Sequence, residues 1–593
     1  MAEISSTNLV TMFFDRAAQY GSEPFLWHKV DGKYESLSWA DVNTRVVALA
    51  RGLLALGIEK GDRVVLVSEN RPGWLVSDVA IMAAGGISTP AYTTNTSADH
   101  KHILEDSGAK GAIVSTPKLA EKLIAGAKGN DTLQFIIVMD HENMKSDDLQ
   151  IISMDDVLET GQVRDENIIA MADDIDKDVV ACIIYTSGTG GTPKGVMLHH
   201  GAILHNCRGA IEALADLEIE REVFLSFLPL SHSYEHTAGL YFPISIGGEI
   251  YYAEGVEALS SNMLEARPTI MTAVPRLYEV LYQKITTGVA KAGGLKQKMF
   301  EKTRQLGAKR YHDGRLGLID SIIDCILDKL VREKVRGRFG GRLKALVSGG
   351  APLNPDIGMF FTSLGLRILQ GYGQTESAPL ISVNRAPSLR LHTVGPAVRD
   401  TEVKIAEDGE IVVRGELVMK GYWNNDKATK ETIKDGWLHT GDVGHIDENG
   451  HIVITDRKKD IIVNSGGDNI APQRIEGILN AETEINQTMV YGDKRPHLVA
   501  VIAPDPDWMR DWAKKNNKPN DLAVLADDKE FHSALAPAIG RVNKAVNNIE
   551  KVRRFIIAHE AFTVENEQMT PTMKVRRHVV KEIYGDRLEA LYG

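Results

Sequence analysis

An apolar segment that ends in a glycine-rich loop limits the folds open to this chain more than any other feature. Residues 179–185 carry no charged side chain, which is typical of a strand buried on both faces, as in a parallel sheet. Earlier in the chain, a helix with one apolar face is expected over 38–56 and a buried strand over 63–67. This alternation of helices and strands predicts an α/β fold built on a parallel sheet.

Composition narrows the class of protein. At roughly 100–200 residues per domain, the 593 residues predict several folding units. Hydrophobic residues make up 43% and charged residues 25%, which argues against a disordered, collagen-like or membrane-spanning chain. The 68 basic residues are outnumbered by 80 acidic ones, giving a net charge of −12, so binding to nucleic acid is not expected.

Cysteine usage and the first residues bear on the compartment. Cys182, Cys207 and Cys325 are widely spaced and form no CxxC pair, so neither a disulfide framework nor a thiolate metal site is expected. The first residues lack a basic start followed by an apolar core, so no secretory signal is predicted. A reducing, cytoplasmic location is therefore expected.

The pattern changes in the last third of the chain. Short alternating strands near 401–405 and 410–413 are joined by Asp-Gly and Asn-Gly turns, which predict antiparallel structure, a small β-barrel at about 391–456. Mixed α/β signals return beyond residue 460. A charged run at 456–460 marks the expected boundary between a large domain, 1–458, and a small domain, 459–593.

The loop after the first apolar strand has the chemistry of a phosphate-binding loop. Residues 185–195, YTSGTGGTPKG, combine glycines, whose backbone N–H groups can approach an anion, with hydroxyls and the cationic Lys194. A P-loop is excluded, because Pro193 stands where that motif needs glycine and Gly195 where it needs Ser or Thr. The sequence predicts a phosphate loop of another architecture, and a purely structural turn is the alternative.

Two further clusters follow predicted strands. Residues 348–352, SGGAP, come after a strand at 344–347, and residues 371–376, GYGQTE, after one at 366–369. Ligands of open α/β sheets bind at such carboxyl ends of strands. Glu376 offers a hard oxygen suited to Mg²⁺, and Thr375 offers a hydroxyl. The alternative is a turn followed by a helix cap.

Two motifs lie nearer the C-terminus. Residues 436–442, GWLHTGD, end in Asp442, whose carboxylate can accept hydrogen bonds from two ribose hydroxyls. Residues 456–460, DRKKD, contain Arg457, a rigid fork of donors for the same sugar or for a phosphate. Surface turns with solvated charges are the alternative for both.

Taken together and in this order, these motifs closely resemble the adenylate-forming acyl-CoA synthetase superfamily, which includes acyl-CoA ligases, luciferases and adenylation domains of peptide synthetases. The resemblance extends from about residue 44 to 577. Residues 228–232, LPLSH, and 371–384 look most like bacterial long-chain fatty-acid–CoA ligases. The family's fold is a large domain of two α/β subdomains and a β-barrel, followed by a smaller mobile α+β domain.

The resemblance implies roles for individual residues. The loop that contains Thr186, Ser187, Gly188, Thr189, Gly190, Gly191, Thr192 and Lys194 would close over the β- and γ-phosphates of ATP. Gly349, Gly350 and Ala351 would line the adenine slot, with Tyr372 against the base. Thr375 would bind the α-phosphate and Glu376 would hold Mg²⁺. Asp442 and Arg457 would grip the ribose.

The resemblance also implies roles in the small domain and the acyl site. Lys459 matches the hinge, and Lys574 matches the lysine that bridges carboxylate and phosphate during adenylation. Gly466 and Gly467 would line the path of CoA. His232 would line the acyl or carboxylate site. Two positions depart from the common pattern: Gly190 replaces a threonine, and Met573 replaces the glycine before the lysine.

The implied reaction uses ATP, Mg²⁺ and coenzyme A. A long-chain fatty acid would be converted to acyl-AMP with release of pyrophosphate, and the acyl group would then pass to the CoA thiol, releasing AMP. Three alternatives stay open: a CoA ligase for medium-chain or aryl acids, an acyl-AMP ligase that loads an acyl carrier protein, and a catalytically dead fatty-acid-binding protein.

Two other features have competing interpretations. Residues 232–236, HSYEH, fit the HxxEH pattern of zinc proteases, but the flanking LPLS favours the acyl pocket. Residues 291–344 hold fifteen basic against six acidic residues, with apolar residues at helical spacing over 318–331. A basic amphipathic helix can lie on the inner face of an anionic membrane. We favour a helix packed on the core with a solvated basic flank.

Overall fold

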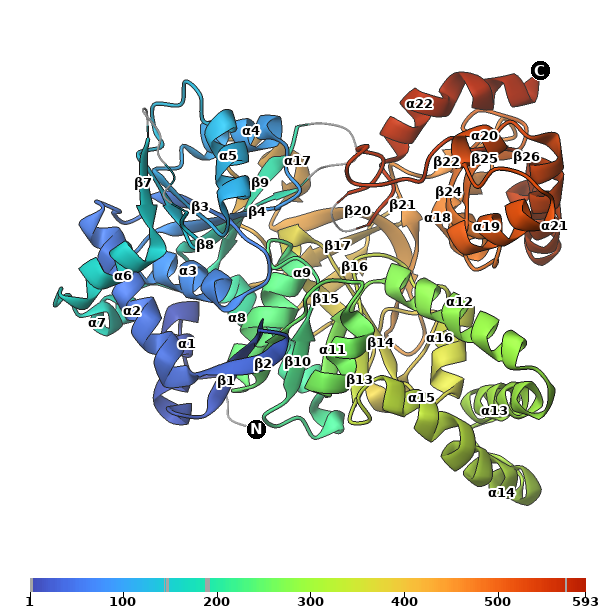
Figure 1. Ribbon diagram of the computed structural model, residues 1–593, viewed down its shortest axis with the longest axis horizontal. Coiled ribbons are helices and arrows are strands. Elements are labelled where there is room, and N and C mark those ends of the chain that lie inside the picture. Colours follow the sequence, from blue (N-terminus) through green and yellow to red (C-terminus); the bar gives the residue numbers. More distant parts are fainter. Residues whose placement is uncertain (1–3, 143, 145–148, 187–191, 571–572) are drawn as a thin grey trace.

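The computed structural model describes residues 4–142, 144, 149–186, 192–570 and 573–593 (Figure 1). Two large sheets with their helices form most of the molecule, and a smaller unit that begins after β21 (Ile452–Arg457) lies at one end of it (Figure 1). None of the helices in these described ranges is long and apolar enough to cross a membrane.

The first sheet has the strand order β18-β9-β8-β4-β3-β5-β6-β7. Its central strands are parallel, whereas β8 and β9 form an antiparallel hairpin. The bounds are β3 (Arg63–Val67), β4 (Ile87–Ala91), β5 (Gly111–Val114), β6 (Phe135–Val138), β7 (Gln150–Ser153), β8 (Val180–Thr186), β9 (Lys194–His199) and β18 (Gly421–Tyr422).

Helices cover both faces of this sheet, which explains its continuous apolar strands. In β3, Val64 and Leu66 belong to the core cluster of α2 and α3, and Val65 and Val67 to that of α4 and α5. The helices of this part are α1 (Leu9–Tyr20), α2 (Trp39–Ala55), α3 (Pro72–Ala83), α4 (Ser97–Ser107), α5 (Pro117–Gly126), α6 (Met154–Gln162), α7 (Ile168–Asp173) and α8 (His200–Ala213). Ser38 caps α2 by accepting from the Asp41 amide, so the predicted helix is confirmed to within a residue at each end.

The second sheet has the order β15-β14-β13-β12-β10-β11-β1-β2, parallel except at its two edges. The strands are β1 (Pro24–Val30), β2 (Lys33–Ser38), β10 (Val223–Ser226), β11 (Glu249–Tyr252), β12 (Ile270–Ala273), β13 (Ala345–Ser348), β14 (Ile368–Gly373) and β15 (Leu380–Val383). The associated helices are α9 (Ser233–Glu235), α10 (Phe242–Ser245), α11 (Leu259–Ala266), α12 (Pro275–Ala292), α13 (Gly294–Asp313) and α16 (Pro355–Ser363). Strand β14 runs through Gly373, so the first residues of GYGQTE lie inside the strand. The sequence analysis wrongly placed them after it.

An antiparallel sheet stands where the sequence predicts a small β-barrel. Its strands are β16 (Glu402–Ile405), β17 (Glu410–Arg414), β19 (Ile433–Lys434), β20 (Trp437–Ile446) and β21 (Ile452–Arg457), with α17 (Asp426–Thr432) beside β18. Strand β20 pairs with β17, β19 and β21 along its length. In the pairing of β20 with β21, Asp442 lies directly opposite Arg457.

The C-terminal unit has cores of its own. Its strands are β22 (Ile462–Val463), β23 (Asn469–Ile470), β24 (Ile485–Tyr491), β25 (Leu498–Pro504) and β26 (Val552–Ile557), and its helices are α18 (Pro472–Leu479), α19 (Pro506–Lys515), α20 (Leu522–Leu525), α21 (Lys529–Ala545) and α22 (Arg577–Glu589). All buried residues of its two apolar clusters come from 462–588.

The basic stretch forms a helical projection at one end of the molecule (Figure 1). After α13 come α14 (Leu318–Leu327), a π-helical turn (Asp328–Arg332) and α15 (Glu333–Arg338). The favoured interpretation, a helix packed on the core, is wrong for five of the apolar side chains, because they are 45–88% exposed: Leu318, Ile319, Ile322, Ile326 and Leu330. Only one face of α14, with Leu327 on it, is buried.

Candidate active site

Three motifs that are far apart in the sequence meet at Asp442. The Tyr372 hydroxyl donates to one Asp442 oxygen at 2.7 Å, and Nε of Arg457 donates to the other at 3.1 Å. Burial, and then the charge of Asp442, raise the pKa of Tyr372 well above its ordinary value. The phenol therefore stays protonated and keeps donating to the carboxylate. Asp442 is 5% exposed, so β14, β20 and β21 together present a fixed, charged acceptor.

Lys574 approaches this group from the C-terminal unit. Its backbone carbonyl accepts from the Thr570 amide at 2.8 Å, and its amide donates to the Thr570 hydroxyl at 3.1 Å, so Thr570 fixes the backbone of Lys574. Burial, and then the charge of Arg457, lower the pKa of Lys574 to about 8, while Asp442 acts in the opposite direction. Burial, followed by the charge of Lys574, lowers the pKa of His232 to about 3. Lys574 is thus within electrostatic reach of Arg457, Asp442 and His232.

Glu376 and Lys194 flank a tyrosine that the sequence analysis did not single out. The Tyr422 hydroxyl donates to Glu376 Oε1 at 2.8 Å, and Lys194 Nζ lies 4.9 Å from the centroid of the same ring. Tyr422 is placed by the pairing of β18 with β9, opposite Val196. No sequence motif points to Tyr422, because its place beside Glu376 depends on the pairing of two strands that are over 200 residues apart in the sequence. Thr375 lies beside Glu376, and its hydroxyl is 2.9 Å from that of Ser233.

The glycine-rich loop leaves β8 and returns in β9. Thr186 and Lys194 are paired across the hairpin, so the two ends of the loop are held together. Thr192 is exposed, and the carbonyl of Pro193 lies 2.8 Å from Nε2 of His102. The predicted phosphate-loop residues Ser187, Gly188, Thr189, Gly190 and Gly191 lie outside the described residues.

The SGGAP segment follows β13 and needs its glycines for two different reasons. A Cβ on Gly349 would lie 2.9 Å from the Tyr234 ring, which is anchored by a 2.8 Å bond from its hydroxyl to the carbonyl of Val347. Gly350 has φ +82°, which other residues rarely adopt. Ala351 is exposed at the end of this turn. Residues 349–351, called the ledge below, therefore form a turn that packs against the Tyr234 ring.

Comparison with known proteins identifies the family. A sequence model described as AMP-binding enzyme matches residues 13–423, and one described as AMP-binding enzyme C-terminal domain matches residues 459–593. The chain belongs to the AMP-binding enzyme family. The resemblance to adenylate-forming enzymes that the motifs predicted is thereby confirmed.

Relatives of this AMP-binding enzyme match over nearly its whole length. The long-chain-fatty-acid–CoA ligase FadD15 of Mycobacterium tuberculosis is 32% identical, with 99% of this chain and 97% of the relative covered. Long chain acyl-CoA synthetase 6, peroxisomal, of Arabidopsis thaliana is 30% identical, covering 95% and 82%. The adenylation domain of a carboxylic acid reductase from Segniliparus rugosus, solved with AMP and a carboxylic acid, superposes with a TM-score of 0.80 at 22% identity, covering 99% and 94%. The predicted α/β fold class is confirmed.

The HSYEH segment does not assemble a zinc site in this AMP-binding enzyme. Nδ1 of His232 accepts from the Tyr234 amide at 3.2 Å, whereas Nε2 of His236 lies 3.0 Å from a carboxylate oxygen of Asp78, deep in the core. Glu235 accepts from the hydroxyls of Ser226 and Thr272 at 2.6 and 2.7 Å, and burial raises its pKa to about 7. The two histidines face different partners, so they cannot share an ion. The preference for an acyl-site role over a protease is consistent with this arrangement.

Asp78 is expected to matter for stability and not for metal binding. Replacing it by alanine leaves His236 and the Tyr241 hydroxyl, which donates to Asp78 at 2.6 Å, buried without their acceptor. At about 1–3 kcal/mol for each unsatisfied buried group, Asp78→Ala should lower the free energy of unfolding by about 3 kcal/mol in urea titrations. Asp78→Asn keeps one acceptor oxygen and should cost less. Equal, negligible losses for both would contradict this assignment.

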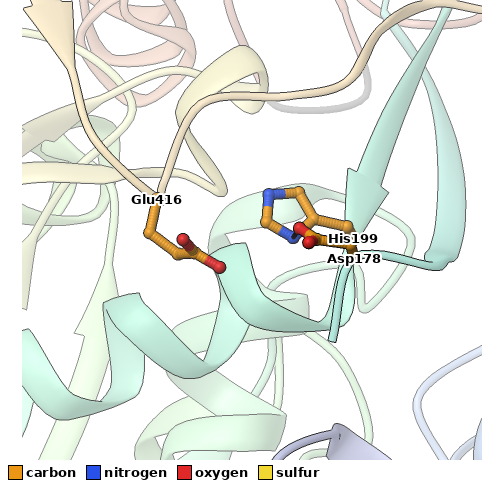
Figure 2. Close-up of side chains that lie close together, drawn as sticks. All are labelled: Asp178, His199 and Glu416. Atoms are coloured by element: carbon orange, nitrogen blue, oxygen red, sulfur yellow. Dashed lines mark ion pairs between the residues drawn. The ribbon is translucent and has the colours of Figure 1, made fainter. Parts of the chain in front are cut away.

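A cluster of Asp178, His199 and Glu416 has the composition of a metal site, but its partners argue against one (Figure 2). Glu416 is paired with Lys177 at 2.9 Å and Asp178 with Lys420 at 3.0 Å. Nδ1 of His199 is 3.2 Å from the carbonyl of Lys177, so this nitrogen carries the proton and cannot bind a cation. The cluster belongs to a network of ion pairs that ties the residues just before β8 to the segment before β18.

The remaining predicted residues lie in exposed turns. Lys459 is exposed between β21 and β22. Gly466 and Gly467 are exposed in the turn between β22 and β23, where the Asn464 side chain accepts from the Gly466 amide at 2.8 Å. Gly467 has φ +86°, as a left-handed turn requires.

Proposed function

We propose that this AMP-binding enzyme activates a long-chain fatty acid with ATP and transfers the acyl group to coenzyme A. One observation carries the proposal: Lys574 of the C-terminal unit comes within electrostatic reach of Asp442 on β20 and Arg457 on β21. The same lysine also acts on His232. Full-length relatives named long-chain-fatty-acid–CoA ligases support the choice of substrate and acceptor. The reaction is acyl adenylation with release of pyrophosphate, followed by thioester formation with release of AMP.

The first half-reaction requires the neutralisation of negative charge. A fatty carboxylate attacks the α-phosphorus of ATP and expels pyrophosphate, so two anionic groups must approach each other. In our proposal, Lys574 is the cation between them, and His232, which its low pKa keeps neutral, lines the carboxylate site without adding a charge. Thr375 binds the α-phosphate. The glycine-rich loop with Thr186, Thr192 and Lys194 covers the outer phosphates.

The nucleoside is held by polar groups that are already fixed. Asp442 retains free lone pairs on both oxygens and accepts from the ribose hydroxyls, and Arg457 donates to the sugar. The ledge at Gly349, Gly350 and Ala351 receives the adenine. The Tyr372 hydroxyl bonds Asp442 and so positions it, in addition to the role against the base that the sequence suggested.

Glu376 fits a magnesium site of the kind found in nucleotide-binding enzymes. One of its oxygens accepts from Tyr422, and the side chain is a hard carboxylate near the loop that carries Lys194. Mg²⁺ is commonly bound by one or two carboxylates together with the phosphates of the substrate. When bound, the ion would reduce the negative charge on the phosphates. The protein's part is to orient the carboxylate, and the Tyr422 hydroxyl does this.

The boundary between a large domain, 1–458, and a small domain, 459–593, remains part of the proposal, with Lys459 as the hinge. Separate apolar cores on the two sides of this boundary support it. Rotation about Lys459 would withdraw Lys574 after adenylation and bring the turn with Gly466 and Gly467 to the path of CoA. Two different reactions at one site require such a change of groups.

The decisive test is a panel of fatty and aryl acids assayed for CoA-dependent release of AMP. Long-chain acids should give the highest kcat/KM, and each should also drive ATP–pyrophosphate exchange without CoA. Exchange without CoA-dependent AMP release would indicate a carrier-loading ligase. A preference for aryl or medium-chain acids would indicate another CoA ligase, and no exchange with any acid would leave a binding protein.

We further propose that the exposed face of α14 rests on an anionic lipid bilayer, where a long-chain acid is concentrated. The apolar stripe Leu318, Ile319, Ile322, Ile326 and Leu330 is exposed to solvent. Exposed basic residues lie in the same projection: Arg315, Lys329, Lys334 and Arg338. Apolar insertion flanked by cations suits the interface of a membrane with negative lipids. A symmetric contact of this face with a second copy would bring the basic residues of both copies together, so the charge favours an anionic membrane over such a dimer.

Vesicle binding tests the lipid contact. Fully burying one isoleucine is worth about 1.5–3 kcal/mol, so Ile319→Gln with Ile322→Gln should weaken binding to phosphatidylserine vesicles by about tenfold or more. Ile583→Gln, which changes an isoleucine on α22 that is 50% exposed, serves as the control and should bind normally. High salt should also weaken binding. Undiminished binding by the double variant, or a change in oligomeric state in place of vesicle binding, would overturn the proposal.

A further inference from the structure

Polar contacts join helix α12 to the C-terminal unit. Nη1 of Arg276 donates to the backbone carbonyl of Asn486 at 2.9 Å, and Nη2 donates to the side-chain oxygen of the same residue. Glu279, one turn along α12, accepts from Nη1 at 3.0 Å and fixes the guanidinium. A planar donor fork that grips both oxygens of one residue sets orientation as well as distance.

A second residue of α12 holds the neighbouring turn. The side-chain amide of Gln283 lies 3.2, 3.4 and 3.2 Å from the carbonyls of Asn480, Glu482 and Ile485. These carbonyls belong to the turn that joins α18 to β24. We call Arg276 and Gln283 together with residues 480–486 the docking contact.

The docking contact is connected to the candidate active site on both sides. Helix α12 begins two residues after Ala273, whose carbonyl accepts from the Gly349 amide of the proposed adenine ledge at 3.1 Å. In the C-terminal unit, Glu476 of α18 accepts from the Val490 amide of β24 at 2.7 Å and from Arg577 at the start of α22. Arg577 follows Lys574 by three residues. Hydrogen bonds of Glu476 therefore connect α18 and β24, on either side of the turn that α12 contacts, to the segment that carries Lys574.

We infer that the docking contact holds the C-terminal unit in the arrangement for adenylation and must break before the thioester is formed. Arg276 and Gln283 are then positioning residues for Lys574, although neither touches substrate. The inference rests on the proposed function, because it assigns the contact to one of the two half-reactions. The polar character of the contact fits such a role, because interfaces that open and close within a chain are more polar than permanent ones.

Separate assays of the two half-reactions test this inference. Arg276→Ala with Gln283→Ala should lower acid-dependent ATP–pyrophosphate exchange by about tenfold, equivalent to about 1.4 kcal/mol. Thioester formation from supplied acyl-AMP and CoA should be unchanged or faster. Arg276→Lys, which keeps the charge on a single donor nitrogen but loses the planar fork, should restore part of the exchange. An equal loss of both half-reactions, or no loss of exchange, would overturn the inference.

A matched control lies on the same turn but does not cross to α12. Arg541 of α21 pairs with the side chains of Glu482 and Glu484 within the C-terminal unit. Arg541→Ala disturbs residues of the turn while leaving Arg276 and Gln283 in place. The ratio of the two half-reactions should stay at its original value. A shift like that of the double variant would mean that the turn responds to any loss of packing, which would contradict a specific role of α12.

A distance measurement gives a readout that does not depend on activity. Cys325 is exposed on α14, whereas Cys182 and Cys207 are buried, so one spin label can be attached at the natural cysteine. A second label at Lys515→Cys on α19 reports the position of the C-terminal unit. The unaltered docking contact should give one dominant distance, and the double variant a broader or shifted distribution. Identical distributions would overturn the inference.

The two readouts separate failure of the docking contact from failure of the proposed function. If the chain carries out no acid-dependent exchange at all but the label distribution broadens in the double variant, the docking contact stands and the proposed reaction is wrong. If exchange is normal and the distribution does not respond, the reaction stands and α12 does not hold the C-terminal unit.

Discussion

Lys574→Ala should nearly abolish ATP–pyrophosphate exchange while thioester formation from supplied acyl-AMP continues. Lys574 is within electrostatic reach of Arg457, Asp442 and His232, and in the proposed reaction it lies between the fatty carboxylate and the α-phosphate. Removing a preorganised group that stabilises developing charge typically costs about 10²–10³-fold in rate, so we expect a loss of that size in exchange. The second half-reaction joins a thiol to an ester that is already activated and does not need this cation. An equal loss in both half-reactions would contradict the assignment.

The same lysine predicts a dependence on pH. Burial and the charge of Arg457 lower its pKa to about 8, so the amine is charged below that pH and neutral above it. The kcat/KM of exchange reports groups of the free enzyme, and it should fall as the pH rises through about 8. An arginine stays charged over this pH range, so Lys574→Arg should remove the falling limb of the pH profile. The longer side chain is expected to change the absolute rate of exchange but not this shape. A falling limb that persists in this variant would have to come from another group.

Much of the fold could be predicted because burial and sequence pattern agree. Strands β5 and β6 of the first sheet are apolar along their whole length, as is β3 after Arg63, and the structure covers β3 with helices on both faces. The boundaries of α2 followed from Ser38, whose side chain caps the helix. The end of β14 was missed, because glycine is a poor indicator of strand and Gly371 and Gly373 lie in an edge pairing with β15.

The sequence indicates which side chains have suitable chemistry for the candidate site, but not which of them bond to one another. Asp442 and Arg457 were each expected to hold ribose, yet their mutual bond depends on the register of β20 and β21, which no motif records. Tyr422 was missed for a similar reason, since only the pairing of β18 with β9 brings it to Glu376. Motifs report the chemistry of side chains, and the register between distant strands decides which side chains meet.

The exposed face of α14 shows a further limit of sequence patterns. Helical periodicity predicts that apolar residues share a face, and they do, but it does not say whether another part of the chain covers that face. Here the helix lies at the end of a projection, and Leu318 is 88% exposed while Leu327 is buried. The partner of a face can be known only when the whole fold is known.

Glu376→Gln should reduce exchange by about 10²-fold or more and raise the concentration of Mg²⁺ needed for half-maximal rate. The amide keeps an acceptor for the Tyr422 hydroxyl, which now bonds Oε1 at 2.8 Å, so the fold should be retained. The negative charge that attracts a divalent cation is lost. Exchange measured across a range of Mg²⁺ concentrations, together with a thermal unfolding curve, separates loss of metal binding from loss of structure.

Tyr422→Phe is the matched control for this carboxylate. It removes the hydroxyl that orients Glu376 but keeps both the charge and the ring beneath Lys194. Because the carboxylate and its charge remain, exchange should fall less than in Glu376→Gln, with only a modest change in the Mg²⁺ requirement. The lost hydrogen bond to a charged group, worth about 1.5–3 kcal/mol, should appear mainly in the thermal unfolding curve. If Glu376→Gln left the Mg²⁺ dependence unchanged while Tyr422→Phe altered it, the metal would have to be held elsewhere. The Glu376 side chain would then serve only to accept from the Tyr422 hydroxyl and so hold β18 to the site.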